Sequence, residues 1–170
     1  MSLKKTSEIV AIGFDITEAG PNTFTQEQVS LQLSPLDNEV FVVVAVDLDP
    51  SPPDSITATN TATEMSLSST SLTAVGNLNR SQVIANTKLQ IESEAGAAPG
   101  VGVGFTRTSL DTPQGDLGYI SIIATNDFFV QIEGRNNLAP KAGFGRVWGY
   151  RARASADTFS ALVQGEVLSA

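Results

Sequence analysis

The chain has 170 residues and no cysteine or histidine, and its 18 acidic and 10 basic residues give a formal net charge of −8. This composition excludes a disulfide framework, thiolate metal sites and histidine catalysis. The acidic excess repels phosphate backbones, and Lys4 and Lys5 are too few bases for an arm that binds a genome, so no direct contact with nucleic acid is expected. The length predicts a single domain over residues 1–170.

Apolar residues recur at every second position from the start of the chain, which is the period of a strand with one buried face. Residues 7–17 alternate in this way and predict the first strand, which residues 18–22 interrupt. A second run places Val29, Leu31 and Leu33 on one face. These two runs are expected to form a hairpin or an arch.

The next run, residues 40–48, is apolar and β-branched on both faces, which predicts a central strand covered on both sides. It is much shorter than the roughly 20 apolar residues that span a bilayer. The proline-rich residues 50–54 end this strand, because proline cannot donate a ladder hydrogen bond. Residues 55–71 are rich in Ser and Thr, with Met65 and Leu67 alternating, and predict an edge strand with a solvated face.

The second half of the chain continues with short alternating runs. Residues 82–92 predict a half-buried strand. Residues 101–105 alternate with glycine, so one face of this predicted strand has no side chains and a close contact is expected there. Residues 117–125 and 128–134 predict a hairpin that turns at positions 126 and 127.

The last two runs, residues 144–154 and 159–168, predict a final pair of strands joined at residues 155–157. The whole set of about eight to ten short strands predicts an all-β fold, an antiparallel β-sandwich. The alternation alone leaves three architectures open, because a sandwich, a jelly roll and a closed barrel share this pattern.

Aromatic and basic residues concentrate near the end of the chain. Strand alternation predicts one face with Phe144, Arg146, Trp148 and Tyr150, and the opposite face with Arg151 and Arg153. Because Trp, Tyr and Arg dominate interface hot spots, these six residues are the predicted interface residues. A single tryptophan in a small β domain is also a common core residue, and Trp148→Ala would then cost about 3 to 5 kcal/mol.

Three aspartates flank the proline-rich segment, and no other metal or cofactor site is predicted. Asp47, Asp49 and Asp54 offer hard oxygen ligands of the kind that calcium prefers, although their spacing matches no established calcium loop. Aspartates at the end of a strand also terminate pairing and solvate a turn. Calcium binding is therefore one of two interpretations, and no cofactor is expected.

Catalytic motifs are weak throughout the chain. Carboxylate pairs such as Glu92 with Glu94, or Asp111 with Asp116, have the residue types of a glycosidase. No serine, tyrosine or lysine lies in a motif that would activate it as a nucleophile. We therefore do not expect an enzyme.

An acidic, cysteine-free chain with about eight to ten strands, Ser/Thr/Pro-rich loops and no basic arm resembles single jelly-roll capsid proteins. In length and composition it is most similar to the smaller of the two major capsid proteins of certain tailless icosahedral viruses that enclose an internal membrane. These viruses infect halophilic archaea, and related bacteriophages infect thermophilic bacteria. Residues 143–150 and 40–48 are typical of such sequences.

The resemblance implies a structural protein of the virion. It implies a single jelly roll whose strands stand upright on the shell, and a location in the capsid. Its expected partners are further copies of itself and a second capsid protein, with which it forms pseudo-hexameric capsomers. Proximity to the internal membrane is expected to be peripheral at most.

Two functions from other classes remain open. A carbohydrate-binding module or attachment-fibre head would use the same sandwich, with Trp148 and Tyr150 as a platform for sugar rings. A β-sandwich hydrolase would require two carboxylates in one cleft.

Overall fold

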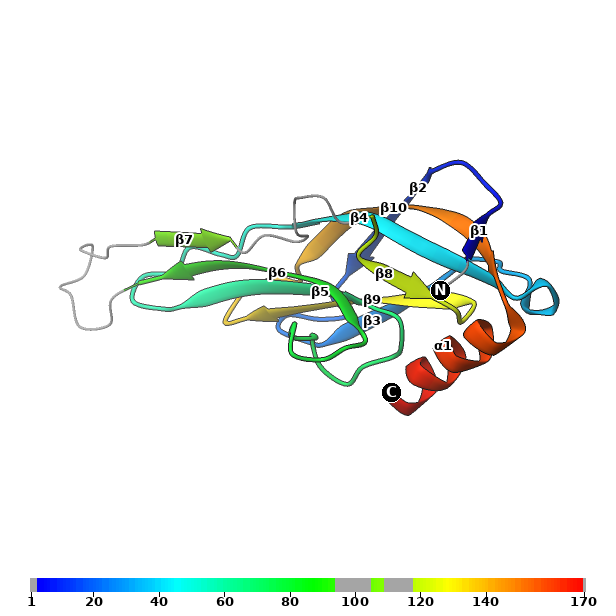
Figure 1. The fold of residues 1–170 in the computed structure, drawn as a ribbon. Helices are drawn as coiled ribbons and strands as arrows, with labels where there is room; N and C mark the ends of the chain where they lie inside the picture. Colours follow the sequence, from blue (N-terminus) through cyan, green and yellow to red (C-terminus); the bar gives the residue numbers. More distant parts are fainter. Residues whose placement is uncertain (1–2, 94–104, 109–117, 170) are drawn as a thin grey trace.

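Two antiparallel β-sheets face each other in the computed structural model, which describes residues 3–93, 105–108 and 118–169 (Figure 1). The first sheet contains β1 (Leu3–Lys5), β2 (Val10–Thr17), β4 (Glu39–Pro50), β8 (Ser121–Ile123) and β10 (Ala142–Ala154). The second sheet contains β3 (Thr25–Ser30), β9 (Asp127–Arg135), β5 (Thr61–Ser68), β6 (Val83–Glu92) and β7 (Phe105–Thr108). A 3-10 turn, η1 (Pro35–Asp37), precedes β4, and a helix, α1 (Ala156–Ser169), follows β10.

The strand pairing is nested from the ends of the chain inward. Strand β2 pairs with β10, β3 with β9, β4 with β8, and β5 with β6, all antiparallel. Such nesting is what a long hairpin gives when it is rolled into two facing sheets, and it is the jelly-roll arrangement. The fold is therefore an all-β antiparallel sandwich with jelly-roll topology, as predicted.

The main core fills the space between the sheets. Its central side chains are fully buried and come from both layers, among them Phe41 and Val147 on the first sheet and Met65, Phe128 and Ile132 on the second. Burial of side chains this large stabilises the fold by about 1.5 to 3 kcal/mol each, relative to exposure. The two sheets therefore hold each other in place through this core.

A second, smaller core explains why β4 is apolar on both faces. Val40 and Val42 lie on the outer face of the first sheet, where they pack with Ala152 of β10 and with residues of α1. The pairing of β4 with β10 shifts at Val44, so β4 contains a bulge there. The predicted central strand with two covered faces is confirmed.

The last predicted strand, residues 159–168, is wrong, because α1 occupies this segment. Ser155 starts the helix: its side-chain oxygen accepts the Thr158 N–H at 3.3 Å. Phe159 and Val163 are four residues apart and pack on the smaller core, as one face of a helix requires. Their odd-numbered positions also fit a strand, which misled the sequence prediction.

The predicted edge strand at residues 55–71 is also wrong, because β5 lies in the interior of its sheet, between β6 and β9. Its outer face is polar but buried. Ser66 donates a hydrogen bond to Gln131 at 2.7 Å, Gln131 donates to Ser68 at 2.7 Å, and the N–H of Gly76 donates to Ser66. The segment between β5 and β6 thus covers this face.

The predicted hairpin at residues 117–134 does not form, since β8 and β9 lie in different sheets. Asn126 lies between them and holds the segment after β3. Its main-chain carbonyl accepts the Leu31 N–H at 2.8 Å, and its side-chain oxygen accepts the Leu33 N–H at 2.6 Å. The link from β2 to β3 likewise crosses between sheets and is an arch. The predicted close contact at residues 101–104 lies outside the described residues.

Candidate functional site

The outer face of the first sheet is covered by α1 at one end and open at the other. On the open half, β10 lies between β2 and β4, and the paired residues form three rows across the strands. From the start of β10, the rows are Asp15–Phe144–Asp49, Gly13–Arg146–Asp47 and Ala11–Trp148–Ala45. The small residues in the last two rows leave room beside the side chains of β10.

We call the exposed side chains of these rows the aromatic–acidic face, defined by Asp15, Asp47, Asp49, Phe144, Arg146 and Trp148; all of them except Asp15 line a shallow surface pocket. The pocket beside β4 measures about 310 Å³. Phe144 is 55% exposed, which is unusual for so large an apolar side chain. The Arg146 guanidinium lies over the Trp148 ring, 5.8 Å from its centre.

The three carboxylates of the aromatic–acidic face have no hydrogen bond or ion pair within the part of the chain that the structure describes. They surround one guanidinium, so the face is electronegative. Such a face attracts cationic groups and repels phosphates.

The fourth predicted aromatic residue, Tyr150, does not belong to this face. Tyr150 packs on the smaller core beside Ala152, and the Lys5 ammonium lies 5.3 Å from the centre of its ring. The structure therefore brings together three of the four residues predicted on this face of β10, and it separates Tyr150 from them. The predicted alternation along β10 is preserved, because Val147 faces the main core.

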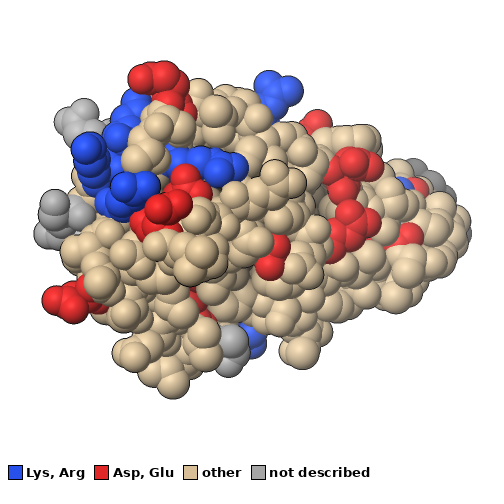
Figure 2. Space-filling model, turned by 90° about the vertical axis from the view of Figure 1, so that its right-hand side faces the viewer, with Lys and Arg blue, Asp and Glu red and all other residues tan. Residues whose placement is uncertain are grey.

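Arg151 and Arg153 lie at the far end of β10 with the two N-terminal lysines. Lys4 pairs in register with Arg153, and Lys5 with Ala152. We call Lys4, Lys5, Arg151 and Arg153 the basic end. Figure 2 shows Lys and Arg gathered at one edge of the molecule, with carboxylates among them.

The two arginines of the basic end have different surroundings. Arg151 donates to the Leu31 carbonyl at 2.9 Å and to the Gln32 carbonyl at 3.2 Å, and it forms an ion pair with Glu39. Arg151 therefore ties β10 to the segment before η1. The Arg153 side chain is 57% exposed and lies 3.4 Å from Asp37, which is equally exposed. Of these two arginines, only Arg153 is thus available to a partner without loss of internal hydrogen bonds.

The three aspartates considered for calcium do not act together. Asp47 and Asp49 lie on the aromatic–acidic face, whereas Asp54 accepts hydrogen bonds from the Lys141 ammonium at 2.6 Å and from the Leu138 N–H at 2.8 Å. The Lys141 hydrogen bond, and after it the Leu138 hydrogen bond, hold the pKa of Asp54 below its usual 3.8. Among the described residues, no three acidic, His or Cys side chains are placed to hold a metal ion.

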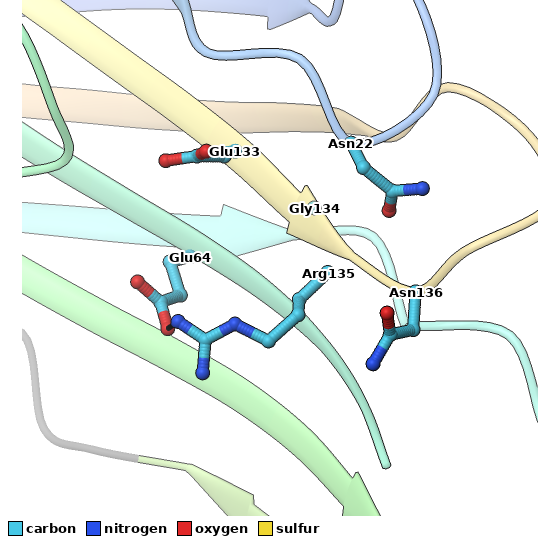
Figure 3. A pocket seen from close by; sticks show the side chains of 6 residues that line it. All are labelled: Asn22, Glu64, Glu133, Gly134, Arg135 and Asn136. Atoms are coloured by element: carbon cyan, nitrogen blue, oxygen red, sulfur yellow. Dashed lines mark hydrogen bonds and ion pairs between the residues drawn. The ribbon is translucent and has the colours of Figure 1, made fainter. Parts of the chain in front are cut away.

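Two carboxylates do line one pocket on the second sheet, as the hydrolase hypothesis requires (Figure 3). Glu64 and Glu133 are cross-strand neighbours on β5 and β9, in a pocket of about 240 Å³. Glu64 forms ion pairs with Lys88 at 2.7 Å and with Arg135 at 3.3 Å. Figure 3 shows the Arg135 guanidinium beside Glu64, away from Asn136. Glu64 is thus already paired with two basic side chains of the same chain.

Sequence reasoning missed two buried carboxylates that fix loops. Glu18 is 4% exposed and accepts the backbone N–H groups of Thr23, Gly134 and Lys141 at 3.0, 2.6 and 2.7 Å. Glu166 of α1 accepts the N–H groups of Ala124 and Thr125 at 2.7 and 3.0 Å. No local motif marks either residue, because their partners are distant in sequence.

Comparison of the chain with protein-family models, with curated protein sequences and with solved structures gives no match. Among the described residues, no helix is both long and apolar enough to cross a membrane. The fold and the surface chemistry define an acidic jelly-roll sandwich with one open, charged sheet face.

Proposed function

We propose that this protein is a structural subunit of an icosahedral viral capsid. The observation that carries the proposal is the nested strand pairing, which gives the jelly-roll topology that viral capsid domains use. Lectin domains also have jelly-roll folds, so the fold alone does not distinguish a capsid subunit from a lectin, and the chemistry of the surface is needed as well.

The surface supports assembly more than catalysis. The open sheet face exposes Phe144 beside Arg146 and Trp148, and aromatic and arginine residues are enriched in protein interfaces. In the pocket on the second sheet, Glu64 is already paired with Lys88 and Arg135, and in the pocket on the first sheet Asp47 and Asp49 lie beside the exposed Phe144. The proposed function is therefore non-enzymatic and needs no cofactor.

The proposed partners are further copies of the chain and a second capsid protein, in pseudo-hexameric capsomers of a shell over an internal membrane. The net charge of −8 supports a subunit that does not contact the genome. Its place would be in the virion shell, with at most peripheral proximity to lipid. These assignments extend the resemblance of the sequence to capsid proteins of that group.

Immunogold electron microscopy of particles purified from the native source tests the proposal. An antibody raised against the protein should label the outer shell of icosahedral particles at regular, high density. The purified protein should also self-associate in sedimentation velocity. Labelling confined to material outside particles, with a strictly monomeric protein at every concentration and ionic strength, would contradict the proposal.

The second candidate is a carbohydrate-binding module, and one observation favours it. Trp148 is only partly buried and lines the same pocket as Asp47 and Asp49, whose oxygens are good acceptors for sugar hydroxyls. Arg146 lies over the Trp148 ring, however, which reduces the ring surface available for stacking. A glycan array with Trp148→Ala as control separates the candidates: saturable binding that the substitution abolishes would favour the module.

A further inference from the structure

The aromatic–acidic face and the basic end lie at opposite ends of one strand. Phe144 is near the start of β10 and Arg153 is near its end. At roughly 3.3 Å per residue, they are about 30 Å apart. Asp47 and Asp49 lie opposite Arg146 and Phe144, so they are about 23 and 30 Å along the sheet from Arg153, and these groups cannot reach each other within one copy of the chain.

Each patch places like charges close together. Lys4 and Arg153 are directly opposite on β1 and β10, and like charges in this arrangement destabilise a sheet. On the other patch, Asp15 and Asp49 flank Phe144, and Asp47 follows in the next row. At the basic end, carboxylates of the same copy already pair with Lys5, Arg151 and Arg153, so among the described residues Lys4 is the basic group there without an acidic partner. On the aromatic–acidic face all three carboxylates are without one, and an oppositely charged partner would relieve their repulsion.

We propose that the aromatic–acidic face binds the basic end of a second copy of this chain. The proposal rests on the proposed structural function and names one contact of the assembly. It follows from charge complementarity: the two patches have opposite sign, and neither can satisfy the other internally. The contact pairs Lys4 and Arg153 of one copy with Asp47 and Asp49 of the next.

The chemistry of the face suits a cationic side chain. Carboxylates accept charge-assisted hydrogen bonds from guanidinium and ammonium groups, and an aromatic ring beside them adds a cation–π contact. The face already shows this mode once, since Arg146 lies over Trp148. Phe144, which is 55% exposed, offers a second ring to the incoming Arg153.

The basic end can release Arg153 at little cost. Its ion pair with Asp37 joins two side chains that are each 57% exposed, and such surface pairs contribute little to stability. Because the contact joins two different patches, it is heterologous and repeats from copy to copy. Copies joined in this way form a ring or a chain, which is the kind of contact that a shell requires.

Charge reversal tests the contact by sedimentation velocity at low ionic strength. One variant carries Asp47→Lys and Asp49→Lys, and the other carries Lys4→Glu and Arg153→Glu. Each alone should associate at least about tenfold more weakly than the original chain, a loss of about 1.4 kcal/mol. An equimolar mixture of the two should associate as strongly as the original chain, because each reversed patch then meets its complement.

A matched control reverses two acids on the second sheet, Glu27→Lys with Glu133→Lys, which changes the net charge as much as the first variant does. This control should associate like the original chain. Circular dichroism confirms that every variant is folded. Association of the original chain should weaken as salt is raised, since salt screens exposed charges.

Two results would overturn the contact and leave the capsid proposal in place. Variants that associate as strongly as the original chain would show that the patches are not in contact. A mixture that fails to regain association would exclude pairing between the two patches. A chain that is monomeric under all conditions would instead overturn the capsid proposal together with the contact, so the two failures are distinguishable.

Discussion

Gly149 of β10 allows two strands and a buried ring to approach closely, and an alanine there should destabilise the sandwich. A Cβ atom at this position would lie 2.4 Å from the Val42 carbonyl oxygen and 2.5 Å from Cε1 of Phe41. The carbonyl belongs to the main chain of β4, so it cannot rotate away. Relief requires β10 to move away from β4 in the centre of the sheet.

The expected cost of Gly149→Ala follows from overpacking of a filled core, which is typically about 1 to 3 kcal/mol. Because main-chain atoms are involved, we expect the upper end, about 3 kcal/mol. For a chain of this size, each kcal/mol lowers the melting temperature by roughly 2 to 4 °C, which gives about 6 to 12 °C. Urea unfolding followed by the fluorescence of Trp148 measures the free energy directly.

Gly13→Ala is the matched control on the neighbouring strand. A Cβ atom at Gly13 would meet only the Gly145 carbonyl oxygen, at 4.0 Å, which is an ordinary contact. Alanine should leave the stability unchanged or raise it slightly, because glycine in a strand costs conformational entropy. If Gly149→Ala unfolds at the same urea concentration as Gly13→Ala, the close approach of β10 to β4 is wrong.

Three further predictions concern the polar groups that hold the loops. Glu18→Gln places an amide NH2 donor where a carboxylate oxygen accepts a buried backbone N–H, and it should lower the free energy of unfolding in urea by about 2 to 3 kcal/mol. The exposed control Glu8→Gln should leave this free energy almost unchanged. The lowered pKa of Asp54 stabilises the fold above the usual value of 3.8, and this stability is lost as pH falls, because the unfolded chain takes up the proton first. Asp54→Asn removes the carboxylate that pairs with Lys141, so the melting temperature of this variant should fall less steeply than that of the original chain below about pH 4. An equally steep fall in both proteins would contradict this. Glu166→Gln should speed amide hydrogen exchange throughout α1, since it removes one of two acceptors that anchor the helix, and unchanged protection would show that α1 does not depend on this anchor.

The strands could be predicted where alternation had one clear meaning. Residues 7–17, 40–48 and 82–92 appear as β2, β4 and β6, because each presents a face to the core and no competing period. The C-terminal segment has a pattern that fits two periods. Phe159 and Val163 fit one face of a strand and also one face of a helix. The segment is a helix in the structure, and this face covers the apolar outer surface of the first sheet at Val42.

The position of a strand in its sheet could not be predicted from its own residues. The polar face of β5 indicated an edge, but Gln131 and the segment after β5 satisfy Ser66 and Ser68 inside the fold. Burial of hydroxyl groups is acceptable once their hydrogen bonds are made. These partners lie far along the sequence, so the local pattern holds no sign of them.

For the predicted interface residues too, the local pattern gave the face of the strand and the tertiary structure gave the neighbours. Alternation correctly placed Phe144, Arg146 and Trp148 on one face of β10. Their acidic neighbours come from β2 and β4, and Tyr150 is removed from the group by the packing of α1. The composition of the aromatic–acidic face is thus a property of strand register.

The sequence by itself determined that this chain is acidic and built mainly of short strands with one buried face, because composition and period 2 are local properties. Only the tertiary structure decided the nested strand pairing, the terminal helix and the separation of an acidic face from a basic end. The physical reason is that register and burial depend on contacts between residues far apart in the chain, and local propensity does not encode which distant partner completes them.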